Sequence, residues 1–166
     1  KPLIISTGLA SIQEIAEAVD TAKSNGCREL ILLKCTSTYP ASAKNINLKT
    51  ISNMRDTFKC EVGLSDHTMG IGVSIAAIAY GATVIEKHLT LDRSDGGVDS
   101  KFSLEPIELK QLCIESKRAW EALGEIKYGP TSAEANAIKK RRSLYIVKNL
   151  TKGTKLNKNN LKKIRP

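Results

Sequence analysis

Long apolar runs are missing from this 166-residue sequence. No stretch approaches the roughly 20 apolar residues that a membrane-spanning helix needs, and no signal peptide is visible. Because the hydrophobic fraction is nevertheless 41%, the chain has enough apolar residues for a core. We therefore expect a cytoplasmic protein with no membrane partner.

Cysteine pairs with the spacing of a zinc knuckle are also missing. None of the four cysteines belongs to a CxxC motif, and each lies in apolar or helical sequence, where a thiol commonly behaves as a small core residue. The sequence therefore predicts free thiols at Cys27, Cys35, Cys60 and Cys113.

An excess of positive charge is absent from most of the chain. Residues 1–106 carry a net charge of −1 and residues 107–166 a net charge of +10. Nucleic-acid-binding surfaces interleave basic residues with aromatic ones or carry a known motif, but aromatic residues make up only 4% of this chain. We expect a solvated basic surface or an acidic partner, and no nucleic-acid partner.

What the sequence does contain is a repeated alternation of strand and helix. Ser11 and Glu14 have the spacing of a capping box, which predicts that a helix begins at Ser11. Four such units without hairpin signals predict a parallel α/β fold. The expected strands are 3–8, 30–37, 61–68 and 82–90, and the other expected helices are 48–58, 70–80 and 108–123.

The only two histidines, His67 and His88, stand at the ends of two neighbouring predicted strands. Because the carboxyl ends of parallel strands meet at one face, we expect the two imidazoles to lie close together. With the flanking carboxylates Asp66 and Glu86, they have the composition of a divalent metal site. Two ligands do not complete such a site, so simple hydrogen bonding of each histidine stays open as an alternative.

All four predicted strands end in polar residues, although the strand interiors are apolar. Packing could account for one strand with a polar end, but it accounts less easily for four. The repetition therefore predicts an active site at the carboxyl face of the sheet. The small donors and two lysines there, Lys34 and Lys87, suit an anionic ligand such as a phosphate or a carboxylate.

Four strings resemble the sialic acid synthase family in the same order: ISTGLAS, LLKCTSTYPA, VGLSDHTMG and EKHLTLDRSDGGVDSKFSLEP. Members of that family condense phosphoenolpyruvate with an N-acylated amino sugar to make nonulosonic acids. The resemblance implies an α/β fold that is the C-terminal half, strands 5 to 8, of a (β/α)₈ TIM barrel. It places this partial barrel at residues 1–125, a linker at 126–141 and the start of a truncated antifreeze-like (SAF) domain at 142–166.

The first four barrel units have no counterpart in the sequence. A whole barrel needs roughly 250 residues, and the family's catalytic glutamate and phosphate-binding lysine come from the early strands. We therefore expect a fragment that is inactive alone, from an enzyme that is a homodimer at full length.

The resemblance also implies roles for individual residues. His67 and His88 are the expected ligands of a divalent metal, with Mn²⁺ favoured over Mg²⁺ or Co²⁺, which polarises the sugar aldehyde while phosphoenolpyruvate attacks it. Glu86 is a candidate proton-handling group. The implied substrate-binding residues are Ser6, Ser37 and Ser65 near phosphoenolpyruvate, Tyr39 and Asp99 around the sugar, and Arg165, which reaches into the partner's site.

The string at residues 96–106 suggests which nonulosonic acid the enzyme makes, because it resembles the pseudaminic acid synthases more than the sialic or legionaminic acid synthases. This favours 2,4-diacetamido-2,4,6-trideoxy-L-altrose as the sugar substrate, with N-acetylneuraminate and legionaminate synthases as alternatives. Two other classes stay open: a Schiff-base aldolase that uses Lys34 or Lys87, and a non-catalytic half-barrel binding module.

Overall fold

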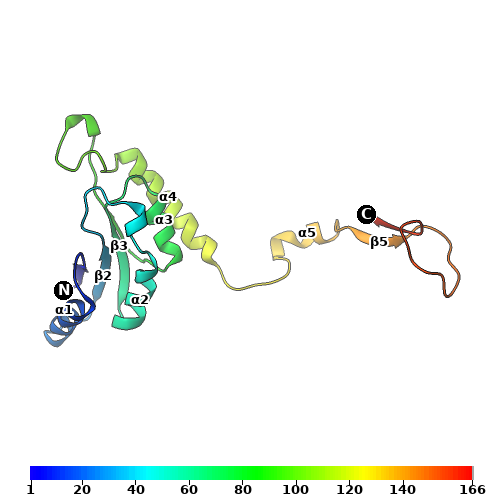
Figure 1. Ribbon diagram of the computed structural model, residues 1–166, viewed down its shortest axis with the longest axis horizontal. Coiled ribbons are helices and arrows are strands. Elements are labelled where there is room, and N and C mark those ends of the chain that lie inside the picture. The colour runs from blue at the N-terminus through cyan, green and yellow to red at the C-terminus, as the bar shows by residue number, and fades with distance from the viewer. Residues whose placement is uncertain (166) are drawn as a thin grey trace. The chain divides into compact units, whose positions relative to one another are not determined.

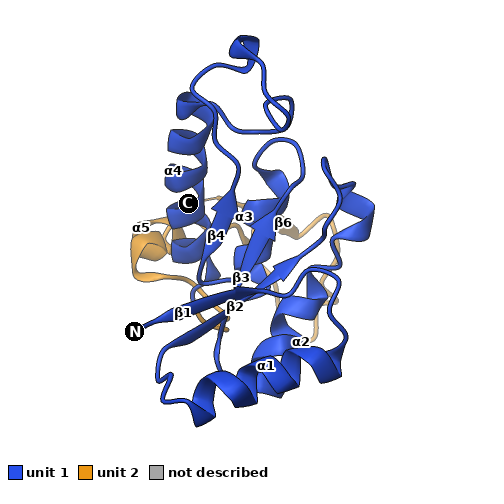
Figure 2. Ribbon diagram, turned by 90° about the vertical axis from the view of Figure 1, so that its left-hand side faces the viewer, with its two compact units in different colours: residues 1–124 blue, residues 125–166 orange. Residues whose placement is uncertain are grey.

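The computed structural model describes residues 1–165, which form two compact units. Unit 1 is Lys1–Gly124, and unit 2 begins at Glu125 (Figure 2). Each unit is described by itself below.

Unit 1 is built on one parallel sheet with the strand order β1-β2-β3-β4 (Figure 1). A helix follows each strand along the chain, which confirms the predicted α/β alternation. The strands are β1 (Leu3–Ser6), β2 (Leu30–Cys35), β3 (Glu61–Asp66) and β4 (Ile85–Lys87), and the helices are α1 (Ile12–Ser24), α2 (Lys49–Phe58), α3 (Gly72–Ala79) and α4 (Pro106–Leu123).

The helix starts follow from local sequence. At α1, the Ser11 backbone N–H donates to Glu14 Oε2 at 2.7 Å and the Glu14 N–H donates to Ser11 Oγ at 3.4 Å, so the predicted capping box is present. Helix α4 begins with Pro106, a residue that lacks the N–H left unpaired in a first helical turn. It therefore starts two residues earlier than predicted.

The strands are shorter than the sequence predicts, because their polar ends leave the sheet ladder. Thr7 Oγ1 donates to Leu33 O at 3.0 Å, for example, and the imidazole of His67 approaches Thr36 O. The Leu33 carbonyl also accepts the Thr7 backbone N–H at 2.9 Å, so the last backbone bond between β1 and β2 lies just beyond the end of β1. Strand β4 has only three residues, against nine predicted at 82–90.

The hydrophobic core lies between the sheet and the helices. Alternate residues of the central strands, Leu32, Val62 and Leu64, are fully buried there. Val19 of α1 and Ile51 of α2 pack against the same cluster. The side chains between them on each strand point to the opposite, helix-free face of the sheet, where Ile4 of β1 is 53% exposed.

Unit 2 contains a small antiparallel ladder of β5 (Ser143–Ile146) and β6 (Leu161–Ile164). A 3₁₀ turn at Ser132–Glu134 and the short helix α5 (Ala135–Ile138) precede it. Asn160 is its buried polar residue, and Asn160 Nδ2 donates to Lys155 O at 3.0 Å. Most of its other side chains are exposed.

The described residues bear on two predictions, one about membrane-spanning helices and one about the cysteines. Within residues 1–165, no helix is long and apolar enough to cross a membrane. All four cysteines are free thiols, as predicted. Cys113, however, is exposed on α4 and is not a core residue.

Candidate active site

Side chains alternate between the two faces of the sheet along β3 and β4, and this alternation decides which face each polar residue at the strand ends occupies. Ser65 pairs in register with Glu86, and Ser65 Oγ donates to Glu86 Oε1 at 2.6 Å on the helix-free face. Two residues further on, each strand places its histidine on that same face. The rings of His67 and His88 lie 5.2 Å apart between centroids, so the predicted meeting of the two imidazoles is confirmed.

The hydrogen-bond partners of the two rings determine which nitrogens remain available. His67 Nδ1 lies 3.0 Å from Thr36 O, and because a carbonyl only accepts, this Nδ1 carries the proton. His88 Nδ1 lies 3.4 Å from the Asp99 Oδ2 carboxylate, which favours the same tautomer. Nε2 is therefore the ring nitrogen that each histidine leaves for a metal, and Nδ1 has the outer hydrogen-bond partner that metal-binding histidines commonly have.

Two aromatic rings line the histidine pair. The Tyr39 ring lies 4.3 Å from the His67 ring, and the Phe102 ring lies 5.0 Å from the His88 ring, measured between centroids. Phe102 is buried, whereas Tyr39 is 55% exposed. His67, beside Tyr39, is only 6% exposed, whereas the His88 side chain is 33% exposed, so solvent reaches the pair mainly at His88.

Asp66 does not lie where the sequence analysis expects it. It was predicted as a carboxylate partner of the histidines, but it points to the helix-facing side of the sheet and pairs with Lys87 at 3.1 Å. The cause is the strand alternation, which sends neighbouring side chains to opposite faces. Asp99, predicted near the sugar, is the carboxylate beside His88. This contact joins a loop to a strand end, and no local sequence pattern predicts it.

The remaining predicted residues differ in burial and in their hydrogen-bond partners. Ser65 is buried beside the histidines, whereas Ser6 is exposed at the carboxyl end of β1. Ser37 lies just beyond β2, with its Oγ 3.9 Å from Cys35 Sγ. Arg165 belongs to unit 2, where its Nε donates to Lys140 O at 3.0 Å. Its predicted role at the active site stays a prediction.

Neither lysine proposed for a Schiff base faces the histidines. Lys34 lies two residues after the core residue Leu32 and therefore on the same, helix-facing side of β2. Its Nζ donates to Thr36 Oγ1 at 2.6 Å. Burial lowers the pKa of Lys34, but the side chain lines a pocket between the sheet and helices α1 and α2. Lys87 is held by Asp66. The aldolase alternative therefore lacks a nucleophile on the face that carries the other polar groups.

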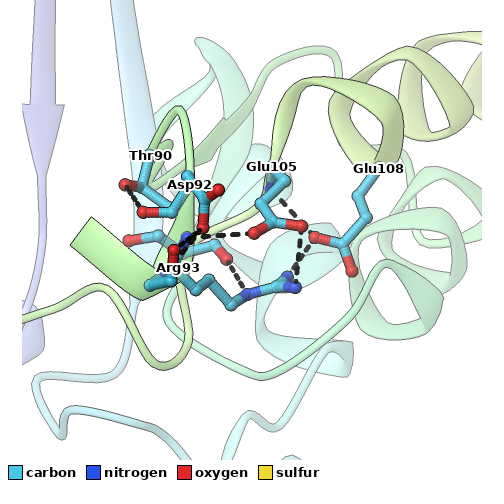
Figure 3. Close-up of polar contacts among 7 residues, drawn as sticks. Thr90, Asp92, Arg93, Glu105 and Glu108 are labelled. Carbon is cyan, nitrogen blue, oxygen red and sulfur yellow. Dashed lines mark hydrogen bonds and ion pairs between the residues drawn. The ribbon is translucent and has the colours of Figure 1, made fainter. Parts of the chain in front are cut away.

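The loop between β4 and α4 carries Asp99 and Phe102, and an arginine clamp closes its base (Figure 3). The Arg93 guanidinium pairs with Glu105 at 3.3 Å and with Glu108, and Arg93 Nε donates to Ser103 O at 3.1 Å. The sequence analysis missed this clamp. The charge-assisted bonds join the beginning of the loop to the start of α4, so they hold the loop beside His88.

Removing the clamp is expected to loosen the loop without unfolding unit 1. Replacement of Arg93 by methionine removes charge-assisted hydrogen bonds worth about 1.5–3 kcal/mol each. We expect the amides of residues 96–104 to exchange hydrogen about tenfold faster or more. The matched control is Arg118→Met, which removes a contact with Glu115 on the exposed surface of α4. Unchanged exchange in Arg93→Met would contradict the role of the clamp.

The histidine pair has room for a metal ion but does not surround one. Within residues 1–165, no group of three or more His, Cys, Asp or Glu side chains is arranged to hold a metal ion. The chemistry of the pair, two imidazole nitrogens, is that of the two protein ligands expected for a divalent metal. Further ligands would be water or substrate.

A parallel sheet whose polar side chains gather at the carboxyl ends of its strands is the arrangement of barrel-type α/β enzymes. Residues 1–128 match the NeuB family, and the chain belongs to this family. The sequence resemblance to sialic acid synthases is thereby confirmed.

Named relatives are similar over the whole chain. The N,N'-diacetyllegionaminic acid synthase of Campylobacter jejuni serotype O:2 is 44% identical over 169 residues, which cover 100% of this chain and 51% of that protein. The pseudaminic acid synthase of the same strain is 41% identical over 169 residues, with 100% and 48% covered. The chain thus spans about half the length of these relatives.

A solved structure shows the same arrangement of strands and helices. The N-acetylneuraminic acid (sialic acid) synthetase of Leptospira borgpetersenii serovar Hardjo-bovis superposes with a TM-score of 0.75 at 38% identity. The match covers 83% of this chain and 48% of that one. Unit 1 is therefore a four-stranded parallel half-barrel that corresponds to part of a NeuB-family structure.

Proposed function

We propose that the protein carrying this chain is a nonulosonic acid synthase, which condenses phosphoenolpyruvate with an N-acylated amino sugar and releases phosphate. The observation that carries the proposal is the His67–His88 pair beside the Ser65–Glu86 hydrogen bond, at the carboxyl ends of the strands of a NeuB-family chain. This arrangement combines two imidazole rings with a carboxylate that accepts a hydrogen bond from Ser65.

Each residue of the candidate site has a proposed role in the reaction. His67 and His88 would hold a divalent metal, with Mn²⁺ proposed, which supplies Lewis-acid polarisation of the aldehyde oxygen. Asp99 orients the His88 ring through Nδ1. Glu86 is placed to take up or return a proton, and Phe102 keeps water from one side of the histidine pair. Ser6, Ser37 and Ser65 are proposed to bind phosphoenolpyruvate, and Tyr39 the sugar.

The sugar is proposed to be 2,4-diacetamido-2,4,6-trideoxy-L-altrose, which gives pseudaminic acid. The support is the string at residues 96–106, because its loop carries Asp99 and Phe102 to the histidines. Legionaminate is the second candidate product, since the legionaminic acid synthase of C. jejuni is 44% identical to this chain and the pseudaminic acid synthase is 41% identical.

Unit 2 is proposed to be the start of an SAF domain that begins at residue 142, after a linker at 126–141. In this proposal the whole protein is a homodimer, and Arg165 of one protomer approaches the sugar site of its partner. The proposal is supported by the separation of the two compact units at Gly124 and by the β5–β6 ladder that follows the linker.

The test is complementation of the chain with a polypeptide that carries the first half of a NeuB-family barrel. We expect no phosphate release from the chain alone and measurable release by the mixture with phosphoenolpyruvate, Mn²⁺ and the altrose sugar. Parallel reactions with the sugar precursors of legionaminic and N-acetylneuraminic acids identify the product branch. Robust release by the chain alone would refute the placement of the catalytic residues, and binding of phosphoenolpyruvate by the mixture without turnover would favour a binding module.

A further inference from the structure

The alignment of β3 with β4 decides whether the two histidines meet. Strand β4 pairs with β3 through three positions only, which are Leu64 with Ile85, Ser65 with Glu86, and Asp66 with Lys87. Because side chains alternate across a sheet, a slip of one residue would turn every β4 side chain to the other face. His88 would then lie on the opposite face from His67. Two backbone bonds precede the ladder, from Thr83 N–H to Val62 O and from Leu64 N–H to Val84 O, each at 2.9 Å, but backbone bonds alone do not select one side-chain register over another.

A buried ion pair lies directly behind the histidines. Lys87 Nζ is 3.1 Å from Asp66 Oδ2, and the two side chains are 2% and 0% exposed, respectively. Asp66 precedes His67 in the sequence, and Lys87 precedes His88. A slipped register would separate the two charges and leave a buried one without its partner, which is strongly unfavourable in a protein interior.

The ion pair is also bonded to the backbone of Thr68, the residue that follows His67. Asp66 Oδ1 accepts from the Thr68 N–H at 2.8 Å, and Lys87 Nζ donates to Thr68 O at 2.6 Å. On the helix side, Ser74 Oγ of α3 donates to Asp66 Oδ2 at 2.5 Å. The position of His67 between Asp66 and Thr68 is therefore tied to β4 and to α3 at once.

We propose that the Asp66–Lys87 pair fixes the register of β3 and β4 and thereby holds the two histidine rings together on the opposite face. Asp66 and Lys87 are positioning residues in this proposal, because they act through the histidines and face away from the substrate side. A buried ion pair contributes little net stability compared with apolar side chains of similar volume, whereas fixing a register is a well-attested role for buried polar groups.

The experiment uses the fact that the chain has only two histidines, so its proton NMR spectrum contains only two imidazole Hε1 signals. The decisive variant is the double replacement Asp66→Leu with Lys87→Met, which removes both charges and leaves neither one unpaired. The matched control is Glu115→Leu with Arg118→Met, which removes an exposed ion pair within α4. Far-UV circular dichroism and the thermal midpoint report whether each protein is folded.

In the parent chain and the control, we expect a nuclear Overhauser effect between the two imidazole rings, whose centroids lie 5.2 Å apart. We also expect added Mn²⁺ to broaden both signals at the same concentration. In the double variant, we expect the inter-ring effect to disappear and the Mn²⁺ concentration for half-broadening to rise about tenfold or more, while the thermal midpoint stays near that of the control.

A folded double variant that keeps the inter-ring effect and the parental Mn²⁺ titration would overturn the proposal. If the double variant does not fold, Ser74→Ala decides the question, because it removes one hydrogen bond to Asp66 and keeps both charges. We then expect a weaker inter-ring effect and about threefold weaker Mn²⁺ broadening, and parental values would overturn the proposal.

The inference rests on the proposed metal role only in its Mn²⁺ measurements. A parent chain that shows the inter-ring effect but no broadening by Mn²⁺ would count against the metal in the proposed function. The inter-ring effect needs no metal, so it would still test the register.

Discussion

Replacement of His67 or His88 by alanine is expected to lower phosphate release by the complemented synthase roughly 100- to 1,000-fold. Each variant removes one of the two proposed imidazole ligands, and with it the metal charge that would stabilise the oxyanion developing on the sugar aldehyde. Loss of one stabilising group lowers the rate by a similar factor at other oxyanion sites. Initial rates of phosphate release at saturating phosphoenolpyruvate measure the loss.

The cause of this loss can be separated from misfolding. Chelation of the parent mixture should abolish release, and added Mn²⁺ should restore it, whereas neither variant should recover at the same Mn²⁺ concentration. Lys110→Ala, on α4, is a control that should keep the parental rate. Full activity in the double variant His67→Ala, His88→Ala would refute the proposed mechanism.

Replacement of Gly63 by alanine is expected to destabilise unit 1 by about 3 kcal/mol, at the upper end of the usual cost of overpacking. A Cβ at Gly63 would lie 2.3 Å from Val84 O and 2.7 Å from Leu33 Cδ2. The Val84 carbonyl cannot move away without losing its bond from the Leu64 N–H at 2.9 Å. The midpoint of urea-induced unfolding measures the change.

The matched control for this substitution is Gly72→Ala at the first residue of α3. An added Cβ at Gly72 meets nothing within 4 Å, and its backbone is not in the left-handed region. Alanine there should be neutral or stabilise by about 0.5–1 kcal/mol, because it reduces the freedom of the unfolded chain. Equal midpoints for the two variants would show that β3 and the segment before β4 are not closely packed at Gly63.

The sequence predicts those features of unit 1 that depend on local patterns. The capping box at Ser11 and Glu14, the alternation of strands and helices, and the meeting of His67 with His88 all follow from residue type and spacing. The strand ends do not, because polar residues such as His67 leave the sheet to make contacts with other loops, and apolar runs do not reveal these contacts.

The predicted site differs from the structure for two reasons. Asp66 and Lys87 were assigned to the active-site face because they lie at strand ends, although adjacent residues of a strand face opposite ways. Asp99 and Arg93 act through contacts across a long loop, and no periodic pattern encodes such contacts. Applying the two-residue alternation to each polar strand end would have separated the histidine face from the lysine face.

The alternation within β3 also has a consequence for how this half-barrel can acquire new activities. Ser65 and His67 face the proposed substrate side, while Val62, Leu64 and Asp66 face the helices, where Val62 and Leu64 belong to the core. A mutational library restricted to the first set would change chemistry while leaving the second set intact, so most of its members should still fold. Randomising Val62 and Leu64 would instead test folding, which makes the two faces a natural pair of libraries for directed evolution.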